Sequence, residues 1–106
     1  IVMPAWMDFH KSLKPARYAM FARRVMGICP HQKTDEELAS EGIAAFKAFI
    51  KECGVPTTLG EKGVTAADIP AIVEGVKTVS FNAEGVLASN PPVTEEMLAE
   101  ILREAL

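Results

Sequence analysis

The sequence predicts an all-α protein, a compact bundle of several helices. Three observations support this class. Apolar residues recur at helical spacing along the chain, and no stretch alternates apolar and polar residues convincingly, as a half-buried strand would. Helix start signals precede three apolar stretches, and glycines end two of the predicted helices. The hydrophobic fraction of 49% is enough for a core, which argues against a disordered chain.

Two helices are expected in the first part of the chain. The first would cover residues 3–13, with Pro4 in its opening turn. Lys14 ends it, because a residue before proline is pushed out of the α region. The second helix would begin at Pro15 and stop at Gly27. Its predicted buried stripe is Tyr18, Phe21, Val25 and Met26.

The strongest start signal is the capping box Thr34-Asp35-Glu36-Glu37, which follows a loop over residues 28–33. The helix should run to Glu52 or Cys53, with Gly54 as its left-handed terminator. Gly42 weakens this helix by roughly 1 kcal/mol relative to Ala, but lets another helix approach closely. The predicted apolar stripe is Ile43, Phe46, Ile50 and Cys53.

A connector over residues 55–63 leads to a second capping box, Thr65 to Asp68. The following helix has the apolar stripe Ile69, Ile72, Val73 and Val76. Pro70 is awkward if Thr65 is the cap and fits better if Asp68 is, so both starts stay open.

The stretch 78–92 is expected to be irregular, with Phe81, Val86 and Leu87 tucked into the core. Thr94 then starts the last helix, with Glu95 and Glu96 at its positive end. Its predicted buried face is Leu98, Ile101, Leu102, Ala105 and Leu106. With no repeat or linker in between, residues 1–106 are expected to form a single helical domain.

Charge and cysteine content narrow the function classes. The net charge of −3 argues against a nucleic-acid-binding protein. The basic residues near the N-terminus are interpreted as solvated side chains: Lys11, Lys14, Arg17, Arg23 and Arg24. Two cysteines, Cys29 and Cys53, do not make a secreted disulfide framework, and a reducing cytoplasm fits best.

The chain opens on the apolar segment Ile1-Val2-Met3-Pro4-Ala5-Trp6-Met7, whereas a natural N-terminus is usually polar. The segment is too short for a membrane span and lacks the basic head of a secretory signal, so no membrane association is expected. We expect a piece cut from a larger protein. The cut would expose Trp6, Met7 and Phe9, and such an apolar patch favours self-association.

The only metal-ligand candidates with soft or imidazole donors are His10, Cys29, His31 and Cys53. Zinc sites pair such ligands at recognisable short spacings, which this set lacks. The preferred interpretation is a buried Cys53 on a helix face, a loop Cys29, and surface or capping histidines.

Other catalytic patterns have simpler explanations. Cys29 and His31 could form a nucleophile pair, but the sequence identifies neither a cause of a lowered thiol pKa nor a third group that would orient the base, so loop residues are the preferred interpretation. The pairs Glu36–Glu37 and Glu95–Glu96 open helices, where capping explains them. The glycines at the two ends of residues 60–63 do not form a phosphate-binding loop, because the following Lys-Ser/Thr pair and the preceding strand are missing. The aromatic residues are interpreted as core: Trp6, Phe9, Phe21, Phe46 and Phe49. No catalytic, cofactor-binding or metal-ligating residue is therefore assigned within the chain.

Five segments together resemble the C-terminal end of the iron-containing alcohol dehydrogenases, the family that includes butanol dehydrogenases. The most telling is Gly54-Val55-Pro56-Thr57-Thr58-Leu59-Gly60-Glu61-Lys62-Gly63-Val64-Thr65, in which a helix ends, a Gly-x-Pro-Thr-x-Leu turn follows and a helix opens. The other segments are residues 1–7, 21–28, 41–46 and 94–102.

This resemblance implies the distal part of the family's helical C-terminal domain, whose partner is the remainder of the parent enzyme. The family interconverts aldehydes or ketones and alcohols with NAD(P)H and a divalent metal, iron or zinc. Its metal is held by one Asp and three His, the last in a His-Gly-x-x-x-Ala segment just before the stretch that matches Pro4-Ala5-Trp6. The resemblance thus implies no metal ligand and no nucleotide-binding loop within residues 1–106. His10 and His31 do not match the ligand motif, and the piece alone is expected to be inactive.

Two other interpretations stay open at this point. The apolar N-terminal segment could belong to a free-standing helical module that binds a partner protein. A small zinc-binding helical domain is the weaker one, and it depends on the four scattered His and Cys residues.

Overall fold

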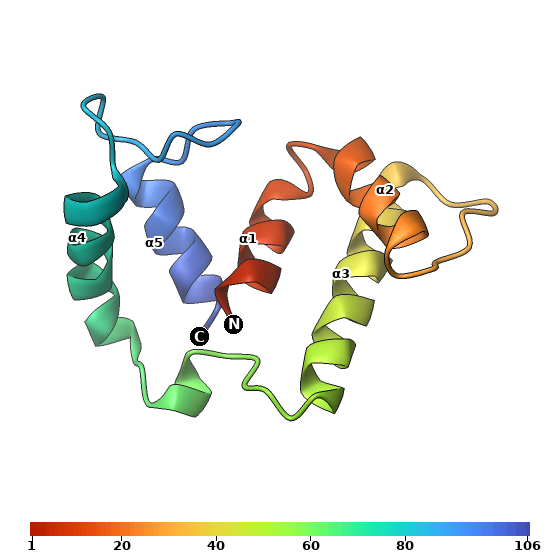
Figure 1. The fold of residues 1–106 in the computed structure, drawn as a ribbon, viewed down its shortest axis with the longest axis horizontal. Helices are drawn as coiled ribbons and strands as arrows, with labels where there is room; N and C mark the ends of the chain where they lie inside the picture. Colours follow the sequence, from red (N-terminus) through yellow and green to blue (C-terminus); the bar gives the residue numbers. More distant parts are fainter. The chain divides into compact units, whose positions relative to one another are not determined.

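The computed structural model describes residues 1–106 and consists of helices and loops (Figure 1), which confirms the all-α class. None of the helices combines the length and apolar character needed to cross a membrane. The chain divides into two compact units, residues 1–57 and residues 58–106. Each unit is described by itself, and the single domain over residues 1–106 stays a prediction.

The first unit contains α1 (Val2–His10), α2 (Pro15–Arg24) and α3 (Asp35–Glu52). The helix expected over residues 3–13 ends at His10, and residues 11–13 form turns instead. Pro15 occupies the first position of α2, as predicted. Gly27 follows α2 with a φ of 68°, the left-handed conformation that glycine adopts without strain. This confirms the predicted stop.

The cap of α3 follows the sequence prediction closely. The Glu37 backbone N–H donates to the Thr34 hydroxyl oxygen at 3.2 Å. The first turn carries three acidic side chains, which stabilise the positive end of the helix dipole. Cys53 caps the C-terminal end, and Gly54 follows with a φ of 72°. Both ends of the longest helix are thus confirmed.

Small side chains hold α2 against α3. Ala19 and Ala22 of α2 are buried together with Leu38 of α3, and Ile28 packs against them. A Cβ atom added to Gly42 would lie 2.5 Å from the Cβ of Ala22, closer than real Cβ atoms come. The expected close helix approach at Gly42 is therefore confirmed.

This close approach makes the predicted buried stripe of α2 wrong. Val25 is 67% exposed, and Tyr18, Phe21 and Met26 are only half-buried. Helices that meet through alanine and glycine bring their backbones together, and larger side chains are left along the flanks of the contact. Phe21 illustrates this, since its ring meets that of Phe46 edge-on at 5.8 Å between centroids.

Two further expectations for the first unit need correction. Ile43 is buried, but Phe46 and Ile50 are half-buried and Cys53 is exposed at the end of α3. In the N-terminal segment Met7 is buried, with Trp6 and Phe9 half-buried. The exposed apolar side chains there are Val2 and Met3, the latter 64% exposed. Self-association through this segment stays a prediction, and it would depend on these two residues.

The second unit contains the short 3-10 helices η1 (Gly60–Lys62) and η2 (Ala66–Asp68), then α4 (Ile69–Ser80) and α5 (Glu95–Glu104). The Thr65 backbone N–H and hydroxyl both donate to the Asp68 carboxylate at 2.8 Å. These bonds lower the pKa of Asp68, the backbone one most. Both open starts are used: Thr65 opens η2, and Asp68 stands at the N-cap position of α4 without a side-chain cap bond, with Pro70 in the first turn of α4.

The core of the second unit matches the predicted stripes. On α4, Ile69 and Val73 are buried and the other two stripe residues are half-buried. On α5, Leu98, Ile101 and Leu102 are buried, as is Ala105 directly after the helix, whereas Leu106 is half-buried. The Met97 backbone N–H donates to the Thr94 hydroxyl oxygen at 3.3 Å, which confirms the start of α5.

The irregular stretch starts later than expected, because α4 continues to Ser80. The Thr78 hydroxyl donates to the Glu74 carbonyl oxygen at 2.9 Å and so bonds back within the helix. Between the helices, the Asn90–Pro91 peptide bond is cis and an isolated antiparallel bridge joins Leu87 to Val93. The three residues expected in the core here are half-buried: Phe81, Val86 and Leu87.

Candidate functional site

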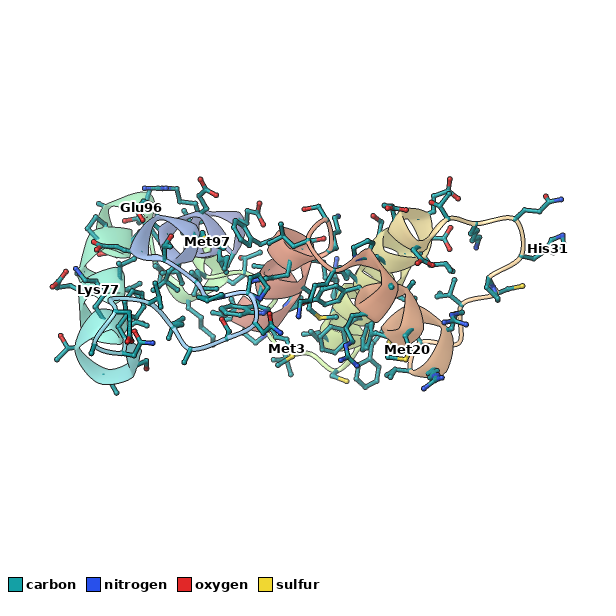
Figure 2. The ribbon with its side chains drawn as sticks, turned by 90° about the horizontal axis from the view of Figure 1, so that it is seen from above. Met3, Met20, His31, Lys77, Glu96 and Met97 are labelled. Carbon is teal, nitrogen blue, oxygen red and sulfur yellow. The ribbon has the colours of Figure 1, made fainter.

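The structure does not bring the metal-ligand candidates together. His31 lies on the loop between α2 and α3 (Figure 2), and the same loop carries the exposed Cys29. Cys53 is exposed at the other end of α3, and His10 ends α1. Nowhere in residues 1–106 do three or more His, Cys, Asp or Glu side chains gather closely enough to hold a metal ion.

Among the metal-ligand candidates, His10 has the surroundings that differ most from expectation. It was expected at the surface or in a cap, but it is only 3% exposed. Its Nδ1 lies 2.9 Å from the Trp6 carbonyl oxygen, and its ring stacks on Trp6 at 4.4 Å and meets Phe9 edge-on at 5.1 Å. Its Nε2 is buried without a hydrogen-bond partner. Helical periodicity weights apolar residues, so it gave no signal that this imidazole is buried.

Beside His10, the Asp8 carboxylate lies between two lysines. Lys11 Nζ donates to one Asp8 oxygen at 3.0 Å, and Lys47 of α3 donates to the other. Burial alone raises the pKa of Asp8, but the hydrogen bonds and charges of Lys47 and Lys11 together hold it below its ordinary 3.8. The Asp8–Lys47 pair therefore ties α1 to α3 when the carboxylate is ionised.

Asp8→Asn should remove a small, pH-dependent part of the stability of the first unit. A carboxyl with a lowered folded-state pKa stabilises the fold above its unfolded pKa and stops doing so as pH falls through the folded pKa. At pH 7 the variant should lose about 0.5–1 kcal/mol, because both lysines are partly solvated. Urea unfolding of both proteins at several pH values measures this loss, which should shrink as the pH falls past the ordinary pKa of 3.8 and vanish below the lower folded-state pKa. A loss unchanged by acid would contradict the assignment.

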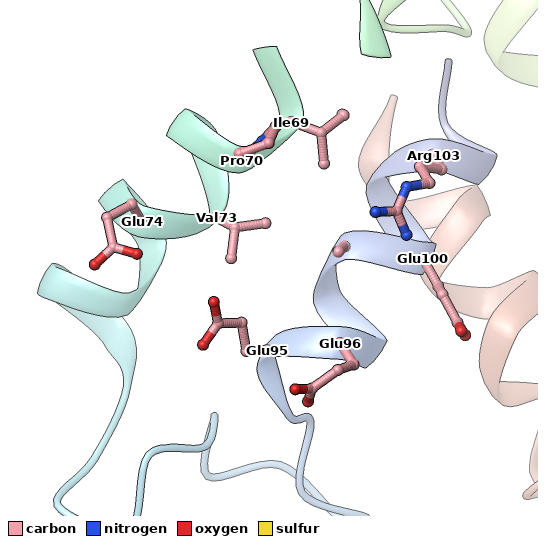
Figure 3. Close-up of a pocket in the computed structure, with 9 residues that line it drawn as sticks. Ile69, Pro70, Val73, Glu74, Glu95, Glu96, Glu100 and Arg103 are labelled. Carbon is pink, nitrogen blue, oxygen red and sulfur yellow. The ribbon is translucent and has the colours of Figure 1, made fainter. Parts of the chain in front are cut away.

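A groove of about 510 Å³ lies between α4 and α5 of the second unit. Figure 3 shows Ile69 and Val73 of α4 pointing toward α5, with glutamates along the edges. We call it the acidic groove, lined by Ile69, Pro70, Val73, Glu74, Glu95, Glu96, Ala99, Glu100 and Arg103. These residues include no serine, threonine, cysteine, lysine or histidine, so the glutamate carboxylates are the reactive groups in the groove.

The charges of the acidic groove are only partly neutralised. Lys77 pairs with Glu95 at 2.9 Å and with Glu74 at 3.2 Å, and these two bonds raise the pKa of Lys77. Neither Glu96 nor Glu100 forms an ion pair. Sequence analysis assigned Glu95 and Glu96 to helix capping alone. The groove was missed because it depends on the packing of α4 against α5.

A second hollow, of about 380 Å³, lies on the first unit along α2. It is lined by Met7, Arg17, Tyr18, Met20, Phe21, Arg24 and Val25. The residues predicted to form the buried stripe of α2 therefore reappear in part as the lining of an open apolar surface. Burial raises the pKa of Tyr18. Arg17 and Arg24, which sequence analysis interpreted as solvated, lie at this hollow and make no ion pair.

Known proteins resemble the whole chain. The sequence profile described as "Fe-containing alcohol dehydrogenase family, C-terminal" matches residues 1–106. A probable NADH-dependent butanol dehydrogenase 1 of Bacillus subtilis (strain 168) is 30% identical over 106 residues, all of this chain and 26% of that protein. The NADPH-dependent aldehyde reductase YqhD of Escherichia coli (strain K12) is 34% identical over 105 residues, 99% of this chain and 26% of that protein.

A solved structure, described as that of a 1,3-propanediol oxidoreductase, shares the fold with a TM-score of 0.81 at 24% identity. The match covers 100% of this chain and 26% of that one. The chain thus spans about a quarter of the length of the relatives that it matches. The expected resemblance is confirmed: the chain belongs to the Fe-containing alcohol dehydrogenase family, and it matches the C-terminal part of that family.

Proposed function

We propose that this chain is the helical C-terminal region of an NAD(P)H-dependent alcohol dehydrogenase that interconverts aldehydes or ketones and alcohols. The family match over residues 1–106 carries the proposal. The relatives named above are an NADH-dependent and an NADPH-dependent enzyme, so the proposal extends to a nicotinamide nucleotide and not to one of the two. The proposed location is the cytoplasm, in keeping with the two free, exposed cysteines.

The residues of this chain do not fit the family's metal. Three or more donor side chains would have to converge, and residues 1–106 contain no such group. The buried His10 has its Nδ1 at the Trp6 carbonyl, while Cys29 and His31 are on a loop. No chemical step is therefore derived through the metal. The proposed role is structural: the helices form one domain that supports the remainder of the enzyme, where the metal and the nucleotide would bind.

The full-length protein that carries this chain should reduce butanal with NADH or NADPH, because its relatives are a butanol dehydrogenase and an aldehyde reductase by name. Residues 1–106 expressed alone should show no turnover above background, because they hold no converging set of reactive groups. The turnover of both proteins is measured as the decrease in absorbance when NADH or NADPH is oxidised, with and without added iron or zinc. Circular dichroism of the separate piece checks that its helices form.

Two results would contradict the proposal. Enzyme-like turnover by residues 1–106 alone would place the reacting groups inside this chain. A full-length protein that oxidises neither nucleotide with butanal or other simple aldehydes and ketones, after loading with iron or zinc, would remove the proposed activity.

A further inference from the structure

We propose that the hollow along α2 is the surface on which the rest of the parent enzyme packs. The covering chain is the part of that enzyme that would precede Ile1, because residues 1–106 match the family's C-terminal part and about a quarter of the relatives' length. This assignment rests on the structural role proposed above and gives that role to named side chains. We call the surface the α2 apolar face, formed by Met7, Tyr18, Met20, Phe21 and Val25.

Two sides of α2 differ in what this chain packs against them. Ala19 and Ala22 are buried at the contact with α3. Tyr18, Phe21 and Val25 stand at positions i, i+3 and i+7 on another side of the helix, a spacing typical of a buried stripe. Within this chain, however, Tyr18 and Phe21 are only half-buried and Val25 is 67% exposed. The helix therefore carries a stripe suited to burial that residues of this chain do not cover.

The apolar surface continues from α2 onto both neighbouring helices of the first unit. On α1, Met3 is exposed and lies one turn before Met7, which lines the hollow. Figure 2 shows Met3 and Met20 on the same side of the first unit. On α3, the exposed Phe49 lies one turn after Phe46, whose ring contacts α2. Exposed apolar side chains gathered over three helices indicate an interface rather than scattered surface residues.

The position of the α2 apolar face along the chain favours the preceding part of the enzyme as its cover. That part would join at Ile1, and Met7 is six residues further along α1, about 9 Å at the rise of an α-helix. The covering chain therefore starts close to the surface, so little loop-closure entropy opposes its packing there. Arg17 and Arg24 also line the hollow and make no ion pair within this chain. The cover should be apolar in its middle, with carboxylates beside these two arginines.

Thiol labelling of Val25→Cys in the full-length protein tests whether the α2 apolar face is covered. The reaction with a maleimide should be at least about 100-fold slower in native buffer than in urea, because a covered thiol reacts only when its surroundings open. Fragment-ion mass spectrometry assigns the label to position 25 and not to the native Cys29 or Cys53. Circular dichroism checks that the variant folds.

Ala16→Cys is the matched control, because Ala16 is an exposed residue of α2 outside the lining of the hollow. It should react nearly as fast in native buffer as in urea. A fast reaction of the folded Val25→Cys variant would overturn the proposal, because the face would then be open. Equal protection at both positions would also overturn it, since the cover would not be specific to this face.

Photo-cross-linking identifies the covering chain. Full-length protein that contains the diazirine analogue of methionine is irradiated, and the products formed from Met20 are identified by peptide mass spectrometry. The cross-links should join Met20 to residues that precede Ile1, in a band of unchanged mass on a denaturing gel. Cross-links of Met20 found only at doubled mass would assign the face to a second copy and overturn the proposal.

Butanal reduction by the same protein reports separately on the proposed activity. An active enzyme whose Val25→Cys variant labels fast would remove only this interface. An inactive protein in which the α2 apolar face is protected and cross-links to the preceding chain would remove only the activity.

Discussion

Ile101→Ala should destabilise the second unit by about 2–5 kcal/mol, the range for removing a large aliphatic side chain from a packed core. Ile101 is 0% exposed and lies on the buried face of α5, next to Leu98 and Leu102. The truncated side chain leaves a cavity in this core, and the loss of stability depends on how far the surroundings can close it. A unit this small has little stability to lose, so the variant should be largely unfolded.

Far-ultraviolet circular dichroism during urea unfolding measures this effect, because both units are helical. Val79→Ala is the matched control, since Val79 is an aliphatic residue of α4 that is 85% exposed. It should change the free energy of unfolding by no more than about 0.5 kcal/mol. Equal losses for the two variants would contradict the core described for α4 and α5.

Gly42→Ala should destabilise the first unit by about 1–3 kcal/mol, although alanine is the better helix former. The new methyl group would lie 2.5 Å from the Cβ and 2.8 Å from the Cα of Ala22. Neither atom belongs to a flexible side chain that could move aside, so α2 must separate from α3. This separation has to cost more than the roughly 1 kcal/mol that alanine gains over glycine in a helix.

Gly75→Ala is the same chemical change as Gly42→Ala, but it should change the free energy of unfolding in the opposite direction. A Cβ at Gly75, inside α4, meets nothing within 4 Å, so this variant should be more stable by about 0.5–1 kcal/mol. Trp6 is the single tryptophan and belongs to the first unit, so its fluorescence reports on the unfolding affected by Gly42→Ala. Destabilisation by both substitutions would point to a general intolerance of alanine rather than to the α2–α3 contact.

Local signals predicted much of this fold. Thr34, Thr65 and Thr94 each begin a helical segment as expected, because a cap depends on residues only three positions apart. Gly27 and Gly54 end α2 and α3 in the left-handed conformation. The stripe of α5 was correct because large aliphatic side chains make its contact with the rest of the core.

The contacts that depend on three-dimensional packing were not predictable in the same way. A periodicity argument weights large apolar residues, so it selected Tyr18 and Val25 where the structure buries Ala19 and Ala22. His10 was misplaced because one sequence gives no sign of aromatic rings closing over an imidazole. The acidic groove was missed for a related reason, since glutamates along a helix usually indicate only a solvated face.

The contact between α2 and α3 also bears on how natural variants of this protein should be ranked. Ala19, Ala22 and Gly42 contribute a close fit between the helices and very little apolar surface. Scores based on polarity would therefore rate their replacement by slightly larger apolar residues as harmless. A newly found allele carrying valine at position 22 deserves more suspicion than one carrying serine at position 25, even though the first looks conservative and the second does not.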